Sequence, residues 1–268
     1  MLVDLHTHLA RDDDAVELSE AALTQRVAQA QARGVAEIAI TEHTHRFIEV
    51  AGLFPDPFWN ATAVTPIDSY IELVTSIGGI VRCGIELDWI PAINKDLQAL
   101  IATRRFDVVL GSVHWLGIEA VDLKRGIWEH MDVETAWRRY FAELRAAALS
   151  GTFDIMAHPD LVKVFGRYPS AAVMQDEFRE TAAAFAEAGV TSEINTAGLR
   201  KPVGELYPSP AFLNELRRAG VPLSLGSDAH VVSDIGRDFD RALELAAGAG
   251  YEAVSSFRQR ERSEVPLG

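Results

Sequence analysis

The sequence has little of several features that mark specialised classes of protein. It has one cysteine, Cys83, in 268 residues, so no disulfide can form within the chain, which suits a reducing compartment. It also has no uninterrupted run of about 18 apolar residues and no basic, apolar leader at its N-terminus. We therefore expect a cytoplasmic protein with no membrane partner.

Positive charge is scarce as well. The 25 Lys and Arg residues stand against 39 Asp and Glu residues, which gives a formal net charge of −14. This balance argues against nucleic acid as a partner, because such binding needs clustered cations. Neither GxGxxG nor GxxxxGK[ST] occurs, which excludes the usual nucleotide-binding open sheets.

What the sequence does contain is an alternation of short apolar runs with longer helical patterns. We expect strands at 2–6, 36–42, 80–88, 107–114, 153–158, 191–195 and 222–228. We expect helices at 19–33, 67–77, 92–103, 133–149, 171–188, 210–219 and 235–248. Alternation of this kind predicts a parallel α/β sheet covered on both faces, either a closed barrel or an open doubly wound sheet. We favour a barrel, formed as one domain over residues 1–268.

Residues that bind metals recur at the ends of the predicted strands. They are His6, His8, His43, Glu86, His114, His158, Asp228 and His230. The carboxyl ends of the strands in a parallel barrel meet at one mouth, where active sites lie. Six of the eight histidines are in this set, and only His45 and His130 fall outside it.

The spacing of these residues indicates how they can share ions. His6 and His8 stand two positions apart and so face the same side of a strand, and Asp228 and His230 repeat this spacing. Imidazole and carboxylate suit zinc, iron or manganese, and the absence of paired cysteines excludes a thiolate zinc site. The set is too large for one tetrahedral ion, so we predict two to three divalent metal ions.

Seven motifs in order resemble one known family. DLHTH, ITEH, GIELDW, GSVHW, AHPDL, EINTAGLRK and GSDAH, spread from Val3 to His230, are similar to the PHP (polymerase and histidinol phosphatase) superfamily and most of all to its histidinol-phosphate phosphatase branch. The resemblance implies a distorted (β/α)7 barrel that holds up to three metals at the C-terminal ends of its strands.

The resemblance also implies how the ligands are shared. His6, His8, Glu86 and Asp228 would bind one metal, and Glu86 would bridge to a second metal held by His114 and His158. The third metal would be held by His43, His230 and an acidic residue from the loop after His8. In this chain Asp14 has the best spacing for that role, ahead of Asp13 and Asp12. Glu42 stands where the family commonly has Asp, and Glu42, Asp4 and Asp160 are either orienting carboxylates or ordinary strand-end residues.

A site of this kind predicts a metal-dependent phosphatase. Two cations can activate a bridging hydroxide for direct attack on phosphorus, and nearby cations would hold the phosphate. By the resemblance Arg200 contacts the phosphate, with Lys201 and Lys163 as weaker candidates. Asp228, His230 or metal-bound water would protonate the leaving group.

The resemblance favours L-histidinol phosphate as the substrate, hydrolysed to L-histidinol and phosphate in histidine biosynthesis. Glu42, Asp160 or Glu205 would then meet the amino group. Two alternatives are a phosphoesterase acting on a small nucleotide, cyclic phosphodiester or sugar phosphate, and an amidohydrolase that cleaves C–N bonds. The cationic pair Arg200 and Lys201 favours a phosphate ester as the substrate over the C–N bond that an amidohydrolase cleaves.

Two segments carry weaker signals. Residues 44–66 lack periodicity and form either an ordered surface loop or a lid over the site. The mixed-charge segment after Gly250 is expected to hold one last strand and a tail.

Overall fold

The structure is a computed structural model that describes residues 1–10, 18–54, 61–124 and 126–267. All seven expected strands are present in it. They are β1 (Leu2–Asp4), β2 (Val35–Ile40), β3 (Val81–Asp88), β4 (Val108–Ser112), β7 (Ile155–Met156), β8 (Thr191–Asn195) and β9 (Leu223–Gly226). All but β8 are shorter than expected, because several of the ligand-type residues lie just beyond the strand ends.

The seven strands form one parallel sheet in the order β1-β2-β3-β4-β7-β8-β9. The first and last strands meet beyond their ends. The amide of Leu5 donates to the carbonyl of Leu225 at 2.9 Å, and the amide of Asp228 donates to the carbonyl of His6 at 2.8 Å. The predicted seven-stranded barrel is confirmed, and it is nearly closed.

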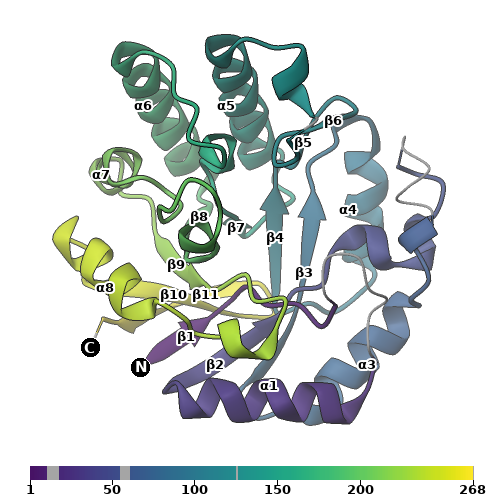
Figure 1. Ribbon diagram of the computed structural model, residues 1–268. Helices are drawn as coiled ribbons and strands as arrows, with labels where there is room; N and C mark the ends of the chain where they lie inside the picture. Colours follow the sequence, from purple (N-terminus) through teal and green to yellow (C-terminus); the bar gives the residue numbers. More distant parts are fainter. Residues whose placement is uncertain (11–17, 55–60, 125, 268) are drawn as a thin grey trace.

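In the described residues, α-helices surround the strands (Figure 1). They are α1 (Glu20–Ala32), α3 (Ile67–Ile77), α4 (Asn94–Ala102), α5 (Val133–Leu149), α6 (Ala171–Ala188), α7 (Pro210–Arg218) and α8 (Phe239–Gly248). Ser19 caps α1 as expected, because its side chain accepts a hydrogen bond from the amide of Ala22. The helix expected at 235–248 begins later, at Phe239. In the described residues no helix combines the length and apolar character needed to cross a membrane.

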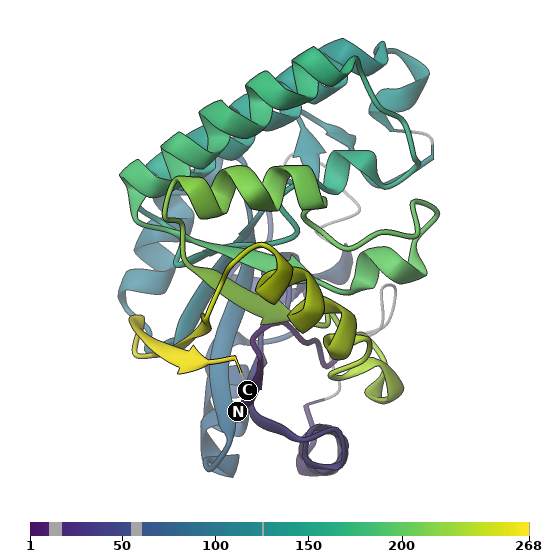
Figure 2. The same cartoon turned by 90° about the vertical axis from the view of Figure 1, so that its left-hand side faces the viewer.

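The C-terminal segment differs from the expected strand and tail. It forms an antiparallel hairpin of β10 (Ala253–Arg258) and β11 (Glu261–Pro266). The amide of Gln259 donates to Asp107 at 3.1 Å, and the guanidinium of Arg260 pairs with Asp154 at 2.9 Å. Asp107 and Asp154 precede β4 and β7, so the hairpin covers the end of the barrel opposite the strand ends where the metal-binding residue types gather (Figure 2).

A second small hairpin, of β5 (Trp115–Leu116) and β6 (Glu119–Ala120), follows β4 and was not expected from the sequence. The described part of the 44–66 segment packs against the barrel. Phe47 is fully buried, its ring lies 5.2 Å from that of Tyr70, and it bridges to Thr65. This part therefore behaves as an ordered loop.

Candidate metal centre

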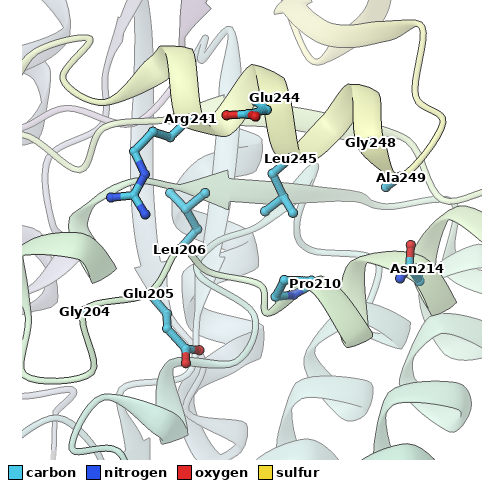
Figure 3. Close-up of a pocket in the computed structure, with 10 residues that line it drawn as sticks. All are labelled: Gly204, Glu205, Leu206, Pro210, Asn214, Arg241, Glu244, Leu245, Gly248 and Ala249. Carbon is cyan, nitrogen blue, oxygen red and sulfur yellow. The ribbon is translucent and has the colours of Figure 1, made fainter.

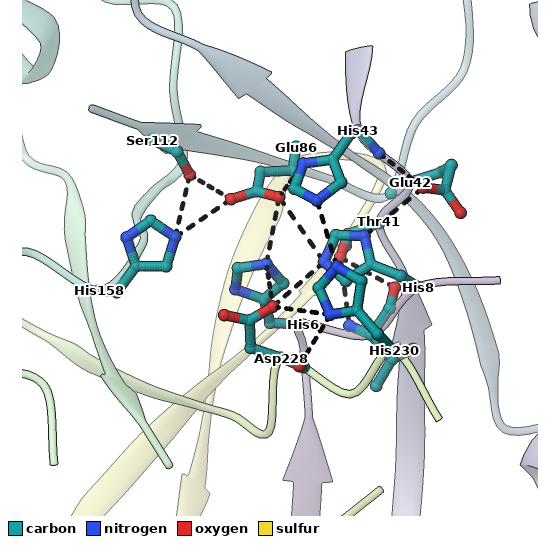
Figure 4. A network of polar contacts seen from close by, with 12 residues as sticks. His6, His8, Thr41, Glu42, His43, Glu86, Ser112, His158, Asp228 and His230 are labelled. Carbon is teal, nitrogen blue, oxygen red and sulfur yellow. Dashed lines mark hydrogen bonds and ion pairs between the residues drawn. The ribbon is translucent and has the colours of Figure 1, made fainter. Parts of the chain in front are cut away.

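Side chains on or just after the C-terminal ends of the barrel strands meet at one mouth (Figure 4). Three groups have ligand atoms that all lie within 4.8 Å of one another: His6, His8 and Asp228; His6, Glu86 and His158; and His8, His43 and His230. The expected gathering of histidines and carboxylates at one mouth is therefore present in the structure.

The ligand atoms of the first group, together with one oxygen of Glu86, are spaced as the ligands of a single metal ion are. His6 Nε2 lies 3.4 Å from Glu86 Oε2 and 3.7 Å from Asp228 Oδ1. His8 Nε2 lies 3.6 Å and 3.4 Å from the same two oxygens. Ligand atoms about 2.1 Å from a tetrahedral zinc ion lie about 3.4 Å from one another. These four atoms can thus surround one ion.

Glu86 links this group to a second one. Its other oxygen, Oε1, lies 3.2 Å from His158 Nε2 and 3.7 Å from His114 Nε2, and it accepts a short hydrogen bond from the hydroxyl of Ser112. One carboxylate therefore faces two clusters of imidazoles, with one oxygen directed to each. This arrangement suits a carboxylate that bridges two cations.

The third group lies on the other side of His8. His43 Nε2 and His230 Nε2 are 3.3 Å apart, and the ring of His8 stacks on both at 4.3 Å and 4.2 Å. The expected acidic partner Asp14, like Asp12 and Asp13, falls outside the described residues.

The buried polar atoms of these side chains fit a bound cation. His6 Nε2, His8 Nε2 and Glu86 Oε2 are buried and make no hydrogen bond to any described residue, although they lie close together. Buried polar atoms are nearly always satisfied, so several unsatisfied ones at one point call for a missing partner. Lone pairs of imidazole and carboxylate on converging side chains are the ligands that a divalent metal requires.

The electrostatics of the site keep the acids charged. Burial disfavours the ionised form of Glu86 and Asp228, but the surrounding imidazoles outweigh it and hold the pKa of both carboxyls well below the ordinary value. Burial likewise opposes the charge on His8, but Asp228 and Glu42 raise its pKa to about 9. Burial and the nearby His8 lower the pKa of His43 to about 3, so His43 presents a neutral ring.

Three carboxylates lie behind the imidazoles. Glu193 Oε1 lies 2.8 Å from His6 Nδ1, and Asp88 Oδ1 lies 2.7 Å from His114 Nδ1. Glu42 Oε1 lies 3.7 Å from His8 Nδ1, while Glu42 Oε2 accepts the amide hydrogens of Leu9 and Ala10. A carboxylate on Nδ1 fixes the tautomer and leaves Nε2 free to bind a cation.

Roles for Glu193 and Asp88 were not predicted from the sequence. The available signal was their position, because Asp88 stands two residues after Glu86 on β3 and Glu193 lies on β8, which ends at the mouth. Residues two apart on a strand share a face, so an acid at that spacing from a ligand faces the same site.

Two of the converging residues have a left-handed backbone. His158 has φ 28° and Asp228 has φ 52°. Such conformations persist only where the surroundings fix them. The amide of His158 donates to Glu193 Oε2 at 2.7 Å, and the amide of Asp228 donates to the carbonyl of His6. Both turns are therefore held by residues of the same site.

A cavity of about 140 Å³ opens beside these side chains. Its lining includes Lys201, Tyr207 and Asp122 together with members of the three groups. Lys201 is thus the expected cation that the structure places at the cavity. Asp122 and Tyr207 were not predicted from the sequence as site residues.

The other two expected cations are engaged elsewhere. Arg200 donates to the carbonyl of Ser227 at 2.7 Å, and its Nε lies 3.2 Å from Asp234 Oδ2. Lys163 is fully buried, and its ammonium donates to the carbonyl of Leu206 at 2.7 Å and pairs with Asp160 at 3.1 Å. Neither is among the described lining residues of the cavity.

The remaining acidic candidates differ in position. Asp4 accepts the amides of Ser227 and Gly236 at 2.9 Å and 3.0 Å and so ties the first strand to the last. Asp160 accepts the amide of Ser209 at 2.7 Å, whereas Glu205 is about half exposed. Asp4 and Asp160 therefore hold the backbone of neighbouring loops in place.

The two histidines outside the set also differ. His45 is buried, and its ring stacks on that of His43 with centroids 5.1 Å apart. The side chain of His130 is 69% exposed. His45 thus lies beside the site, whereas His130 lies on the surface.

A larger cavity of about 620 Å³ lies between α7 and α8 (Figure 3). It is lined by Glu205, Leu206, Asn214, Arg241 and Leu245, among others, and by no histidine of the described chain. The metal-ligand chemistry therefore belongs to the smaller cavity at the barrel mouth.

Comparisons with known proteins agree with this architecture. The model of the PHP domain family matches residues 4–197. A probable histidinol-phosphatase of Deinococcus radiodurans is 35% identical over 183 residues, which cover 68% of this chain and 69% of that protein. The histidinol-phosphatase of Bacillus subtilis is 26% identical over 252 residues, which cover 83% and 92% of the two chains.

A solved structure is similar over almost its whole length. It is histidinol phosphate phosphatase from Lactococcus lactis in complex with zinc, L-histidinol and phosphate, with a TM-score of 0.78 and 22% identity over 98% of each chain. The fold is shared, and the family model covers more than two thirds of the chain. The family resemblance of the seven motifs is thus confirmed: the chain belongs to the PHP domain family.

Proposed function

We propose that this chain is a metal-dependent phosphomonoesterase that hydrolyses L-histidinol phosphate to L-histidinol and phosphate, in histidine biosynthesis. The observation that carries the chemistry is Glu86, whose two oxygens face two separate groups of imidazoles. The substrate follows from relatives named histidinol-phosphatase and from the solved relative that holds L-histidinol and phosphate.

We assign the ligands by the groups described above. His6, His8, Asp228 and Glu86 would hold one ion, and Glu86, His114 and His158 a second. His43 and His230, with His8 adjacent, would hold a third, to which Asp14 would add a carboxylate. Zinc, iron and manganese all suit this mixed set of nitrogen and oxygen ligands.

The chain's own residues would prepare the reaction. Bound divalent cations lower the pKa of a water nucleophile and neutralise phosphate oxygens. Glu193 and Asp88 orient the rings of His6 and His114, so that the ligand atoms are fixed before substrate enters. Asp228, His230 and metal-bound water remain the predicted proton donors to the leaving alkoxide.

Lys201 is our first candidate for the phosphate contact, because it lines the cavity. Arg200 remains a prediction for the same role, since its guanidinium would have to leave Asp234 and the carbonyl of Ser227 to reach the cavity. Lys163 would act indirectly, by joining the loop after His158 to residues 205–207.

The test is phosphate release by purified protein from L-histidinol phosphate and from a panel of nucleotides and sugar phosphates. We expect L-histidinol phosphate to give the highest kcat/KM, loss of activity after exhaustive chelation, and recovery when zinc, manganese or ferrous ion is added back. Preference for a nucleotide would refute the substrate but retain the phosphatase. Full activity in metal-free protein would refute the mechanism.

A further inference from the structure

Tyr207 places a polar group at the metal cavity that no contact within the described residues explains. Its ring lines the cavity together with His158 and Asp228, and the ring centroids of Tyr207 and His158 lie 6.4 Å apart. The side chain is 1% exposed, and its buried hydroxyl has no hydrogen-bond partner among the described residues. Buried hydroxyls are normally paired, so this one calls for a partner that the described residues do not supply.

The backbone of Tyr207 is fixed to the end of a barrel strand. Its carbonyl accepts the amide hydrogen of Asn195 at 2.7 Å, and its own amide donates to the carbonyl of Asn195 at 3.1 Å. Asn195 is the last residue of β8, two positions after the carboxylate that orients His6. Tyr207 is therefore connected to the same strand end as the proposed metal ligands.

The ring is held from two further sides. The ammonium of Lys163 lies 5.3 Å from the ring centroid, over its face. A Cβ on Gly198 would lie 2.9 Å from the ring of Tyr207 and 2.0 Å from the carbonyl oxygen of Glu205. Only glycine at 198 lets this segment come so close. The position of the hydroxyl is thus fixed by its surroundings in the absence of any hydrogen bond of its own.

The chemistry of the cavity indicates what this hydroxyl can meet. The proposed ligands present lone pairs to cations, so a phosphate that enters needs hydrogen-bond donors for its remaining oxygens. Burial, followed by the nearby carboxylate of Asp160, raises the pKa of Tyr207. The phenol therefore keeps its proton at neutral pH and can only serve as a neutral donor or as an acceptor.

We propose that the hydroxyl of Tyr207 donates a hydrogen bond to a non-bridging phosphoryl oxygen of the substrate. The inference rests on the proposed phosphomonoesterase function and adds a contact to it. Tyr207 would touch the reacting group directly, next to the metal ligands, and would assist Lys201 in neutralising the phosphate.

The test compares the wild type with Tyr207→Phe, which removes one oxygen and keeps the ring. Inorganic phosphate is the first probe, titrated calorimetrically into metal-loaded protein. We expect the dissociation constant for phosphate to rise about tenfold, as for the loss of one hydrogen bond to a charged group. We expect kcat/KM for L-histidinol phosphate to fall by about 10- to 100-fold, because charge on the phosphoryl oxygens is contacted in the transition state.

Tyr251→Phe is the matched control. Tyr251 is also a buried tyrosine, but its hydroxyl donates to the carbonyl of Val221 at 3.1 Å, and it is not among the described lining residues of this cavity. We expect this variant to lose some stability and to keep its phosphate affinity and kinetics. Metal content, from elemental analysis, should equal that of the wild type in both variants, and Tyr207→Phe should unfold at an unchanged or higher temperature.

Three outcomes would overturn the inference. Unchanged phosphate affinity and unchanged kcat/KM in Tyr207→Phe would remove Tyr207 from the substrate contacts while the proposed function stands. Loss of metal from this variant would give the hydroxyl a role in the metal site instead. Failure of the metal-loaded wild type to bind phosphate would refute both proposals, whereas binding without hydrolysis of L-histidinol phosphate would refute only the substrate.

Discussion

His6 and Glu193 stand 187 positions apart in the sequence, yet the His6 Nδ1 lies 2.8 Å from Glu193 Oε1 in the fully buried centre of the barrel mouth. The other oxygen of Glu193 accepts the amide of His158 at 2.7 Å. One carboxylate therefore positions the ring of one proposed ligand and the backbone of another. The metal centre depends on this residue as well as on the atoms that face the ions.

We expect Glu193→Gln to lower metal affinity about 10- to 100-fold, because the neutral amide holds the His6 tautomer less firmly. The measurement is metal affinity by competition with a chromophoric chelator. Glu180→Gln, on the exposed face of α6, is the control and should retain the affinity of the wild type. Equal affinity in the two variants would contradict the role of Glu193.

Alanine at His6, Glu86, His158 or Asp228 is expected to abolish turnover and to lower the content of bound metal. Each substitution removes one ligand atom from a group that is proposed to hold an ion. Elemental analysis and phosphate release measure the two effects separately. His130→Ala is the control, since that side chain is 69% exposed and outside the site. Wild-type metal content in all four variants would refute the ligand assignment.

Metal binding should release protons. In the metal-free protein, carboxylates outweigh burial and raise the pKa of His8 to about 9 and that of His114 to about 10. Both imidazoles are thus protonated on both ring nitrogens at pH 7, and a cation that binds must displace one of these protons. Apparent metal affinity should therefore fall as the pH falls, about tenfold per pH unit for each proton released.

Calorimetric titration of metal in two buffers of different ionisation enthalpy measures the number of protons released on metal binding. We expect at least one proton released per protein at pH 7.5, and fewer in His8→Ala. His43→Ala is the matched comparison, because the pKa of His43 is lowered to about 3 and its neutral ring can bind a cation without releasing a proton. Heats that do not depend on the buffer would contradict the prediction.

Gly226→Ala is expected to damage the site through packing. A Cβ at position 226 would lie 1.9 Å from Glu193 Oε1 and 2.7 Å from His6 Cβ. The substitution should lower the free energy of unfolding by about 1–3 kcal/mol and weaken metal binding, since side chains must move to relieve the overlap. Thermal unfolding and metal titration measure both effects.

Gly248→Ala, in α8, is the control for this substitution. No atom lies within 4 Å of a Cβ built there, so alanine should be neutral or stabilise by about 0.5–1 kcal/mol. Equal stability of the two variants would show that Gly226 tolerates a side chain.

Lys201→Ala should raise KM for the phosphomonoester and leave metal content unchanged, because Lys201 lines the cavity. Arg200→Ala tests the alternative expectation. A larger rise in KM for Arg200→Ala than for Lys201→Ala would show that the guanidinium turns into the cavity when phosphate is bound.

The strands and the gathering of ligands were predictable because both follow from local patterns. Apolar runs covered on two faces predict parallel strands, and the place of residues such as His114 and His158 at their ends predicts a shared mouth. The prediction of the barrel and of its family was confirmed. The C-terminal hairpin was not predicted, because its mixed-charge strands lack an apolar alternation and are fixed by contacts to Asp107 and Asp154.

The supporting contacts of the site were less predictable. Nothing local distinguishes Arg200, held by Asp234 and a distant carbonyl, from a cation that faces the cavity. The same holds for Lys163, whose burial depends on residues 43 positions further along the chain. Such partners come together only through the closure of the barrel, so single-residue chemistry cannot identify them.

The strand contacts between the first and last members of the barrel have a consequence for biosynthesis. His6 and His8 leave the ribosome more than two hundred residues before Asp228 and His230. A nascent chain would therefore carry half of a chelating shell for most of its synthesis and could not retain an ion there. Stable metal uptake would therefore follow the emergence of both segments and their pairing across the barrel.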